Sequence, residues 1–191
     1  MKNTTVVKLM VPLSEYASVS ATATLADAVA ALAKAQECYD PSRYRHRAVL
    51  VVDEQDQVVG KISQAHVLKA LEPKYFEELE IDGDLGIHRL SNYILKTMVD
   101  KYDLFEDPFD EACRRAAQLP IRKVMHRPRS DEFIDKDGSL GEAIHRLVVG
   151  CHQSLLVRDG GRVIGVLRLT DLFAAAAALM QPSRTTTQPT R

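Results

Sequence analysis

Apolar and polar positions follow one order along the chain, and that order occurs twice. A short extended stretch precedes a helical stripe of apolar residues; two continuous apolar runs and a second helical stripe follow. In the first half the extended stretch lies around Val19 and the first helical stripe starts at Thr24. The two apolar runs are "AVLVV" and "VVGKI", and the second helical stripe covers 64–71. In the second half the extended stretch lies around Ile134 and the first helical stripe starts at Ser139. The two apolar runs are "SLLV" and "VIGVL", and the second helical stripe covers 170–180. The pattern predicts the order β-α-β-β-α in each half, with each pair of runs forming a hairpin.

The two halves match closely enough to indicate a duplication. "KLM" at Lys8 corresponds to "KVM" at Lys123, an offset of 115 (123 minus 8). Gly60 corresponds to Gly165 at an offset of 105 (165 minus 60), so the first copy has ten extra residues between its helix and its second strand. A repeated supersecondary unit of this kind buries its apolar face against its sister copy.

The starts of the two central helices carry capping signals. Thr24 precedes Asp27 by three residues, and Ser139 precedes Glu142 in the same way, the latter as a full capping-box pattern. The strand runs are too continuously apolar for a sheet with one wet face. We therefore expect helices to cover one side of each sheet and the sister copy to approach the other.

Composition and charge narrow the classes of function. The 191 residues carry 25 Lys and Arg against 26 Asp and Glu, a net charge of -1. The chain as a whole therefore has no positive electrostatic potential that would attract nucleic acid, and nucleic-acid binding is not expected. No apolar run reaches the roughly 18 residues of a membrane span. These features predict a cytoplasmic protein that does not enter a membrane.

The cysteines and the motif search indicate neither a metal site nor an enzyme. Three cysteines, an odd number without a CxxC pair, argue against disulfides and a zinc site, and Cys151 is expected to be a small buried thiol. The sequence has no G-x-S-x-G, Walker A or HExxH motif. We expect no catalytic activity and no metal.

Two tandem units of this order, each with an "LM" or "VM" lead-in and a hairpin closing on glycine-apolar-apolar and then a helix start, resemble a pair of CBS domains, the Bateman module. The resemblance covers residues 5–72 and 120–180. It implies an α/β (α+β) fold in which two repeats pack through their sheets about a pseudo-twofold axis and leave two clefts. It also implies homodimers, and ligands such as AMP, ADP, ATP, NAD or S-adenosylmethionine.

The resemblance places the ligand site at the closing junction of the second copy. Asp171 matches the family's ribose-binding aspartate, Arg168 stands where the family usually has Ser or Thr, and Thr170 adjoins both. A helix start suits a phosphate, and a carboxylate there can accept two hydrogen bonds from a ribose diol. The predicted nucleotide-binding residues of this copy are Asp171, Thr170, Arg168, Gly165, Ile134 and Arg127.

Simpler interpretations of the same residues stay open. Thr and Asp at a helix start are common capping residues, so Thr170 and Asp171 would suit a fold without ligand as well. Arg168 and Lys61, each in a strand, are equally consistent with solvated edge residues. The basic segment around Arg127 is consistent with a solvated loop.

The first copy departs from the family pattern in the opposite way. Ser63 keeps the hydroxyl, but His66 replaces the aspartate. Imidazole cannot accept two hydrogen bonds from a diol as a carboxylate does. We therefore expect binding chiefly in the second copy. The first site would be empty, bind another ligand, or supply Lys61 and His66 to a phosphate.

The connection between the copies, 73–119, is long and predicts two helices. The first aligns Leu90, Ile94 and Met98 on one face, and the second runs over 109–119. They would either pack on the module and its dimer partner or form a docking surface for an unknown effector protein. The alanine-rich stretch before Met180 suggests close helix packing, and the polar tail 181–191 is expected to be disordered.

Together these features predict a regulatory module that senses an adenosyl ligand and signals to a partner. The alternative hypothesis is a scaffold that binds no ligand and acts through the inserted helices.

Overall fold

The computed structural model describes residues 5–37, 45–77, 97, 99, 101 and 103–180. Its elements in chain order are η1 (Val6–Lys8), β1 (Val11–Pro12), η2 (Leu13–Glu15), β2 (Ser18–Ser20), α1 (Leu25–Glu37), β3 (Ala48–Val52), β4 (Val58–Ser63), α2 (Gln64–Lys69), α3 (Lys74–Glu77), α5 (Phe109–Ala117), α6 (Ile121–Val124), η4 (Ser130–Glu132), β5 (Phe133–Asp135), α7 (Leu140–Val149), β6 (Ser154–Asp159), β7 (Arg162–Arg168) and α8 (Leu169–Met180). The η elements are 3-10 helices.

The predicted repeat order is confirmed. Repeat 1 is β2-α1-β3-β4-α2, and repeat 2 is β5-α7-β6-β7-α8. In each repeat the first strand pairs in parallel with the second, and the second and third form an antiparallel hairpin. The first strand and the hairpin are joined by a helix, as a parallel pairing requires.

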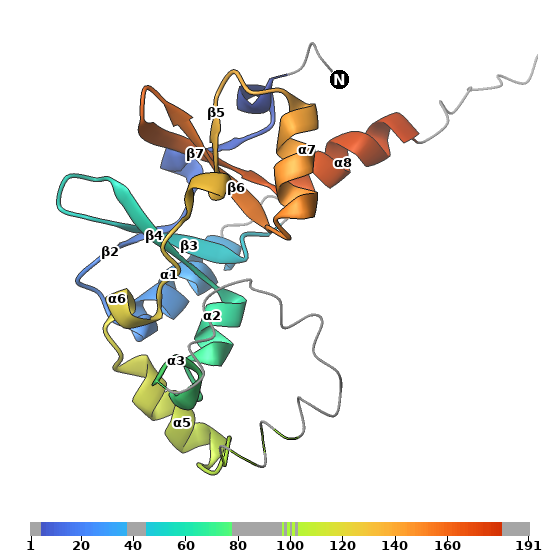
Figure 1. Ribbon diagram of the computed structural model, residues 1–191. Coiled ribbons are helices and arrows are strands. Elements are labelled where there is room, and N and C mark those ends of the chain that lie inside the picture. Colours follow the sequence, from blue (N-terminus) through green and yellow to red (C-terminus); the bar gives the residue numbers. More distant parts are fainter. Residues whose placement is uncertain are drawn as a thin grey trace, which may run out of the picture.

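The two sheets pack face to face, with the helices on their outer sides (Figure 1). Between the sheets lies an apolar cluster that includes Leu50 of β3 and Leu156 and Val166 of β6 and β7. A second cluster joins the three-stranded sheet to α1, and a third joins the four-stranded sheet to α7 and α8. This arrangement explains the continuous apolar runs, because each hairpin strand has a run of consecutive buried residues that covers both of its faces.

The segments that lead into the repeats exchange places. β1 precedes repeat 1 in sequence but pairs with β7 of repeat 2, where Val11 lies opposite Val166. The lead-in to repeat 2 instead meets β4 of repeat 1, where Lys61 and His126 exchange two backbone hydrogen bonds of 3.0 Å. Each repeat is therefore completed by a segment that the sequence places before the other.

The glycine of each hairpin makes room for this exchange. A Cβ on Gly165 would lie 2.6 Å from the backbone oxygen of Val11, and one on Gly60 would lie 2.5 Å from the sulfur of Met125. Both distances are far below a van der Waals contact. The Val11 backbone excludes a side chain at Gly165, whereas at Gly60 the Met125 side chain would have to move.

The capping boxes differ from the prediction. At the first helix the box is reciprocal: Thr24 N donates to Asp27 Oδ2 at 2.8 Å, and Asp27 N donates to Thr24 Oγ1 at 3.3 Å. At the second, Ser139 Oγ accepts from Glu142 N at 3.1 Å, but the Glu142 carboxylate accepts from Arg146. The expected full box at Ser139 is therefore wrong in its second half, because a guanidinium one turn away binds the carboxylate.

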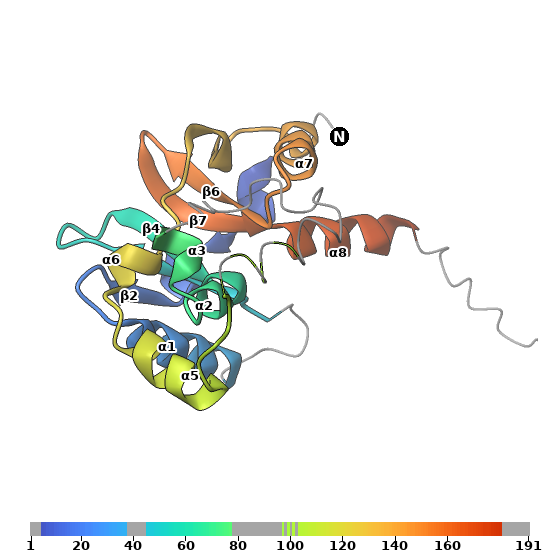
Figure 2. The same cartoon turned by 60° about the horizontal axis from the view of Figure 1, so that its bottom comes forward.

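The insertion contributes α3 and α5 to the described structure. α5 lies beside α1 (Figure 2) and buries Ala112 and Ala116, close to the helix expected over 109–119. Of the other predicted helix, Thr97 and Lys101 are described and helical, whereas Leu90, Ile94 and Met98 lie outside the described residues, as does the tail 181–191. Within the described residues, no helix has the length and apolar character needed to cross a membrane.

Candidate functional site

A cavity of about 1230 Å³ opens between the two repeats. The junctions that close both repeats line it: Ser63 and His66, from the β4–α2 junction, and Arg168 and Thr170, from the β7–α8 junction. Four residues that the sequence predicted from two separate clefts therefore lie around one space. The packing of the two sheets brings the two junctions together.

Matching backbone hydrogen bonds fix the two junctions in the cavity wall. In repeat 1, Gln64 N donates to the carbonyl of Arg47 at 3.1 Å, and in repeat 2, Leu169 N donates to the carbonyl of Gln153 at 2.9 Å. Each bond links the first residue of a closing helix to the residue just before the first strand of the hairpin, β3 or β6. Arg47, Gln153 and Ser154, which the sequence analysis did not identify, line the cavity for this reason.

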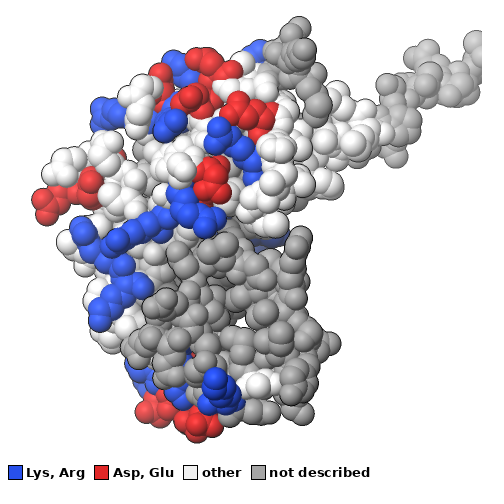
Figure 3. Space-filling model, in the orientation of Figure 1, with Lys and Arg blue, Asp and Glu red and all other residues white. Residues whose placement is uncertain are grey.

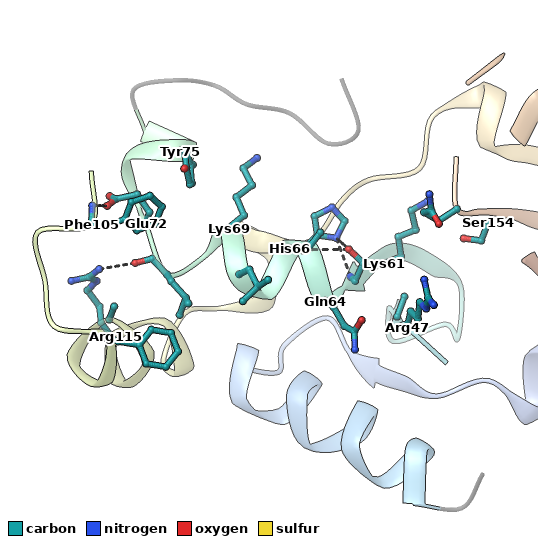
Figure 4. A pocket seen from close by; sticks show the side chains of 18 of the residues that line it. Arg47, Lys61, Gln64, His66, Lys69, Glu72, Tyr75, Phe105, Arg115 and Ser154 are labelled. Carbon is teal, nitrogen blue, oxygen red and sulfur yellow. Dashed lines mark hydrogen bonds between the residues drawn. The ribbon is translucent and has the colours of Figure 1, made fainter. Parts of the chain in front are cut away.

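The described residues give the cavity a positive lining. Its charged members are two carboxylates, Glu72 and Asp107, and six basic residues: Arg45, Arg47, Lys61, Lys69, Arg115 and Arg168. Figure 4 shows Arg47, Lys61 and Ser154 toward one end and Glu72, Phe105 and Arg115 toward the other, with His66 and Lys69 between them. Among the six basic residues, Arg115 pairs with Asp107, Lys61 with Glu132 and Arg168 with Asp171. The excess of cations that remains in this concave site raises the local concentration of anions.

Arg168 binds the carboxylate of Asp171 through two side-chain contacts. Arg168 Nε donates to Asp171 Oδ2 at 2.8 Å, and Nη2 donates to Oδ1 at 2.6 Å. The side chains are 7% and 15% exposed. Burial opposes the charge of Arg168, but its hydrogen bonds to Asp171 and the charge of that carboxylate outweigh burial and raise the pKa of Arg168.

The predicted ribose-binding aspartate therefore already has partners in this structure. Its Oδ2 also accepts from Arg168 N at 3.2 Å, which is the capping role that the simpler interpretation assigned to Asp171. Thr170 lines the cavity beside it. Arg168 is buried, so the interpretation of Arg168 as a solvated edge residue is wrong.

His66 takes the equivalent capping position in repeat 1. Ser63 N donates to His66 Nδ1 at 3.0 Å, and His66 N donates to Ser63 Oγ at 3.4 Å. An Nδ1 that accepts from an amide cannot also carry the proton, so the neutral ring is protonated on Nε2. Imidazole thus reproduces the local hydrogen bond of the aspartate.

Lys61 lies in a buried charged cluster that joins the repeats. Lys61 and His126 each donate a short hydrogen bond to Glu132, one to each carboxylate oxygen. Burial alone would raise the pKa of Glu132, but the bond from His126 and the charge of Lys61 outweigh it and lower the pKa to about 2. His126 also stacks on His66, with ring centroids 5.9 Å apart.

This cluster corrects two interpretations of the sequence. Lys61 is not a solvated edge residue, because it is buried against Glu132 of the other repeat. Its charge is already paired, which weakens the idea that it serves a phosphate in the first copy. Sequence reasoning missed Glu132, because a glutamate in a three-residue 3-10 helix directly before a strand carries no signal of its burial.

The remaining predicted residues lie away from the cavity lining. Gly165 faces the crossing lead-in, and Ile134 is 1% exposed in the core of repeat 2. Arg127 is exposed, and basic side chains run across the middle of the face drawn in Figure 3. The structure therefore brings together four of the eight predicted residues and places Asp171 directly behind them.

The insertion forms the far end of the cavity. Glu72 accepts from Phe105 N at 2.6 Å and from Lys74 N at 3.2 Å, so it ties α3 to the segment before α5. Tyr75 packs edge-on against Phe105 with ring centroids 5.9 Å apart. The sequence predicted the second helix of this segment but gave no indication that it would border a cavity.

Burial affects the titration of one tyrosine in the cavity wall. Tyr16 lines the cavity, and burial, opposed by Arg168 and reinforced by Asp171, raises the pKa of its hydroxyl to about 12.

Cys151 is exposed with φ at 54°, so the expected buried thiol is wrong. Among the described residues, no three or more His, Cys, Asp or Glu side chains are grouped to hold a metal ion.

The fold and the shared cavity define a tandem α/β module whose two repeats build one site. The model of the CBS domain matches residues 7–73 and 121–178. These matches cover well over half of the 191 residues, and the chain belongs to the CBS-domain family, with two copies of the domain.

Solved structures with the same fold share little sequence with this chain. A structure described as CBSX2 in complex with AMP is 17% identical, with a TM-score of 0.58, and the match covers 93% of this chain and 99% of that chain. A CBS domain-containing protein of unknown function from Bacillus anthracis str. Ames Ancestor is 17% identical, with a TM-score of 0.59 and coverage of 92% and 94%.

A hypothetical conserved protein from Geobacillus kaustophilus is 18% identical, with a TM-score of 0.57 and coverage of 93% and 98%. These likenesses establish the fold. Among curated proteins, none matches the chain in sequence.

Proposed function

We propose that this chain is a regulatory CBS pair that binds an adenine nucleotide in the cavity between its repeats and transmits occupancy to a partner. The observation that carries the proposal is a basic cavity lined by both closing junctions, where Thr170 at a helix start and Arg168, which holds the carboxylate of Asp171, form part of the wall. The AMP complex of a protein with the same fold supports this choice of ligand.

The residues around the second junction suit the parts of a nucleotide. Thr170 and Arg168 can donate to a phosphate, and Asp171 can accept from a ribose diol once Arg168 has turned to the phosphate. Tyr16 and Ala48 add less polar surface to the wall. The ligand class is an adenosyl compound with at least one phosphate, such as AMP, ADP, ATP or NAD.

Signalling would follow from a change in fit between the repeats. The cavity is lined by both repeats, so a ligand there contacts both. It can shift the module between two arrangements only by the difference in its affinity for them. The proposed role therefore requires binding and transmission to an effector protein and no bond-making chemistry.

A thermal-shift panel with AMP, ADP, ATP, NAD and S-adenosylmethionine tests the proposal. Ligand at a hundred times its dissociation constant stabilises the folded state by about 2.7 kcal/mol. For a chain of this size, each kcal/mol raises the melting temperature by roughly 2–4 °C. We expect AMP to raise the melting temperature of the native protein and to leave that of Asp171→Ala unchanged.

The matched control is Asp135→Ala. Asp135 also pairs with an arginine in repeat 2, Arg158 at 2.9 Å, but lies outside the cavity lining. This variant should keep the full response to AMP. If no adenosyl compound stabilises the native protein, the ligand-free scaffold becomes the better account.

We also propose that the module forms a homodimer through α8. This helix projects from the body of the protein (Figures 1 and 2), and Phe173 and Leu179 on it are 62% and 89% exposed. Leu172, near the start of α8, packs into the core of repeat 2, but exposed apolar side chains farther along a projecting helix are typical of a contact with another chain.

A further inference from the structure

The pairing of Arg168 with Asp171 bears on which nucleotides this site can accept. Both oxygens of the carboxylate accept from the guanidinium, at 2.8 and 2.6 Å, and one also accepts from Arg168 N. A ribose diol would need the same two oxygens. Guanidinium and ribose therefore compete for one carboxylate edge.

An uncharged ribose is a weak competitor for that edge. Hydrogen bonds between two charged groups are roughly twice as strong as those between neutral groups, and the two-point geometry adds to them. Both side chains are largely buried, so solvent and salt screen their attraction little. Removing the guanidinium without replacing its partner would also leave a buried charge unpaired, which is costly.

A phosphate changes this balance. Its oxygens can take over the hydrogen bonds of the guanidinium, so that Arg168 exchanges one anion for another while Asp171 becomes available to the ribose. The basic lining of the cavity, with Arg47 and Lys69 among its members, favours the same anion. S-adenosylmethionine offers a carboxylate in place of a phosphate, but its sulfonium and ammonium groups give it a net positive charge that a basic lining disfavours.

Resting on the proposed function, we infer that Arg168 is the specificity-determining residue of this site: it covers the ribose-binding carboxylate until a phosphate draws it away. The site then selects phosphorylated adenosine compounds over adenosine and over S-adenosylmethionine. Arginine at this position, in place of the hydroxyl that the family pattern predicts, is what makes phosphate a condition for binding the sugar.

Calorimetric titrations of the full chain with AMP, adenosine and S-adenosylmethionine at one ionic strength test the inference. The native protein should bind AMP at least ~10-fold more tightly than adenosine. Arg168→Thr, which restores the family's hydroxyl, should bind adenosine at least ~10-fold more tightly than the native protein does, and its preference for AMP should shrink.

Two further variants keep the test decisive. Arg168→Lys preserves the positive charge and the fold but cannot engage both carboxylate oxygens, so it should gain a smaller part of the adenosine affinity. Arg158→Thr removes a second Arg–Asp pair from repeat 2, outside the cavity lining, and should behave as the native protein.

The possible failures are distinguishable. Equal affinity of the native protein for AMP and adenosine, or no gain of adenosine binding in either Arg168 variant, would overturn the inference and leave nucleotide binding intact. Absence of binding for all three compounds in the native protein and in both Arg168 variants, together with no response to ADP, ATP or NAD in the thermal-shift panel, would overturn the proposed function, and the inference with it.

Discussion

At the scale of single residues, the most consequential side chain outside the cavity wall is Glu132. It is 1% exposed and carries a charge that Lys61 of the other repeat balances, and it also accepts a hydrogen bond from His126 of the lead-in. A buried ion pair adds little net stability over an apolar core, but loss of one partner leaves an uncompensated charge. Glu132 therefore holds the two repeats in one arrangement.

We expect Glu132→Ala to lower the free energy of unfolding by about 3–5 kcal/mol, because Lys61 then remains buried without its partner. Urea unfolding followed by circular dichroism measures this change. Glu142→Ala is the control: its pair with Arg146 is on the surface of α7, so its loss should cost at most about 1 kcal/mol. Equal losses in the two variants would contradict the assignment.

The same residue predicts a dependence on pH. The folded-state pKa of Glu132, about 2, lies below its ordinary value of 4.5, so the unfolded chain takes up this proton first. The stabilisation is fully present above the ordinary value and is lost as the pH falls toward 2. Glu132→Gln should remove this part of the acid sensitivity in unfolding curves measured between those limits.

Residue-scale prediction from the sequence succeeded where a repeat supplied a comparison. The duplication pointed to Asp171 and to His66 as its counterpart, and both occupy equivalent caps. It gave no sign that Arg168 would turn back onto Asp171, because a pairing three residues apart depends on the buried side of the junction. Glu132 had no counterpart from which its role could be inferred.

At the scale of elements, the exchange of the lead-in segments ties the two repeats together. β1 completes the sheet of repeat 2, and Ile121 and Val124 of α6 enter the core of repeat 1. Neither repeat has its full set of core residues without a segment that belongs, in sequence, to the other. The repeats should therefore unfold as one cooperative unit.

Gly165→Ala tests this crossing. The added Cβ would meet the Val11 backbone at 2.6 Å, which cannot move aside as a flexible side chain could, so we expect a loss of about 1–3 kcal/mol or more. Thermal unfolding with a single transition measures it. Gly141→Ala, in α7 with its nearest atom 3.8 Å away, should stabilise by up to about 1 kcal/mol. A neutral Gly165→Ala would contradict the crossing.

The elements themselves were largely predictable, and their partners were not. Continuous apolar runs predicted both hairpins, and helical apolar stripes with capping signals predicted all four repeat helices within a few residues. The sequence gave no basis for pairing β1 with β7 across more than a hundred positions, because the two-residue strand carries no periodicity. The full capping box was assigned to the wrong helix for a similar reason, since Arg146 decides where Glu142 points.

At the scale of the whole molecule, the two proposed functions, ligand binding and dimerisation, lie at different surfaces. The cavity lies between the repeats, borders the insertion and is lined by the start of α8, whereas the rest of α8 extends away from the body of the protein (Figure 2). Val148 and Val149 of α7 add exposed apolar surface to that of Phe173. A dimer formed there would leave the basic cavity accessible to a ligand.

We expect a dimer of about 43 kDa, twice the chain mass of 21.3 kDa, in sedimentation equilibrium. Phe173→Glu combined with Leu179→Glu should yield the monomer, because charges in an apolar contact are unfavourable. Phe109→Glu, an equally exposed aromatic position on α5, should leave the dimer intact. A native monomer across the concentration range, or dissociation by the Phe109 variant alone, would contradict this contact.

The sequence predicted the repeat architecture, but not that both closing junctions line one cavity. That sharing depends on how two sheets twist and pack, which no local pattern specifies. The basic lining also escaped notice, because its residues come from separate parts of the chain and the net charge is only -1.

The most direct test of the account is an equilibrium titration of AMP into the full chain, with the number of bound molecules and the affinity measured for the native protein and for Asp171→Ala. The account predicts one AMP per chain in the native protein and no measurable binding in the variant. Native protein that binds no AMP, or a variant that binds it with unchanged affinity, would contradict the account.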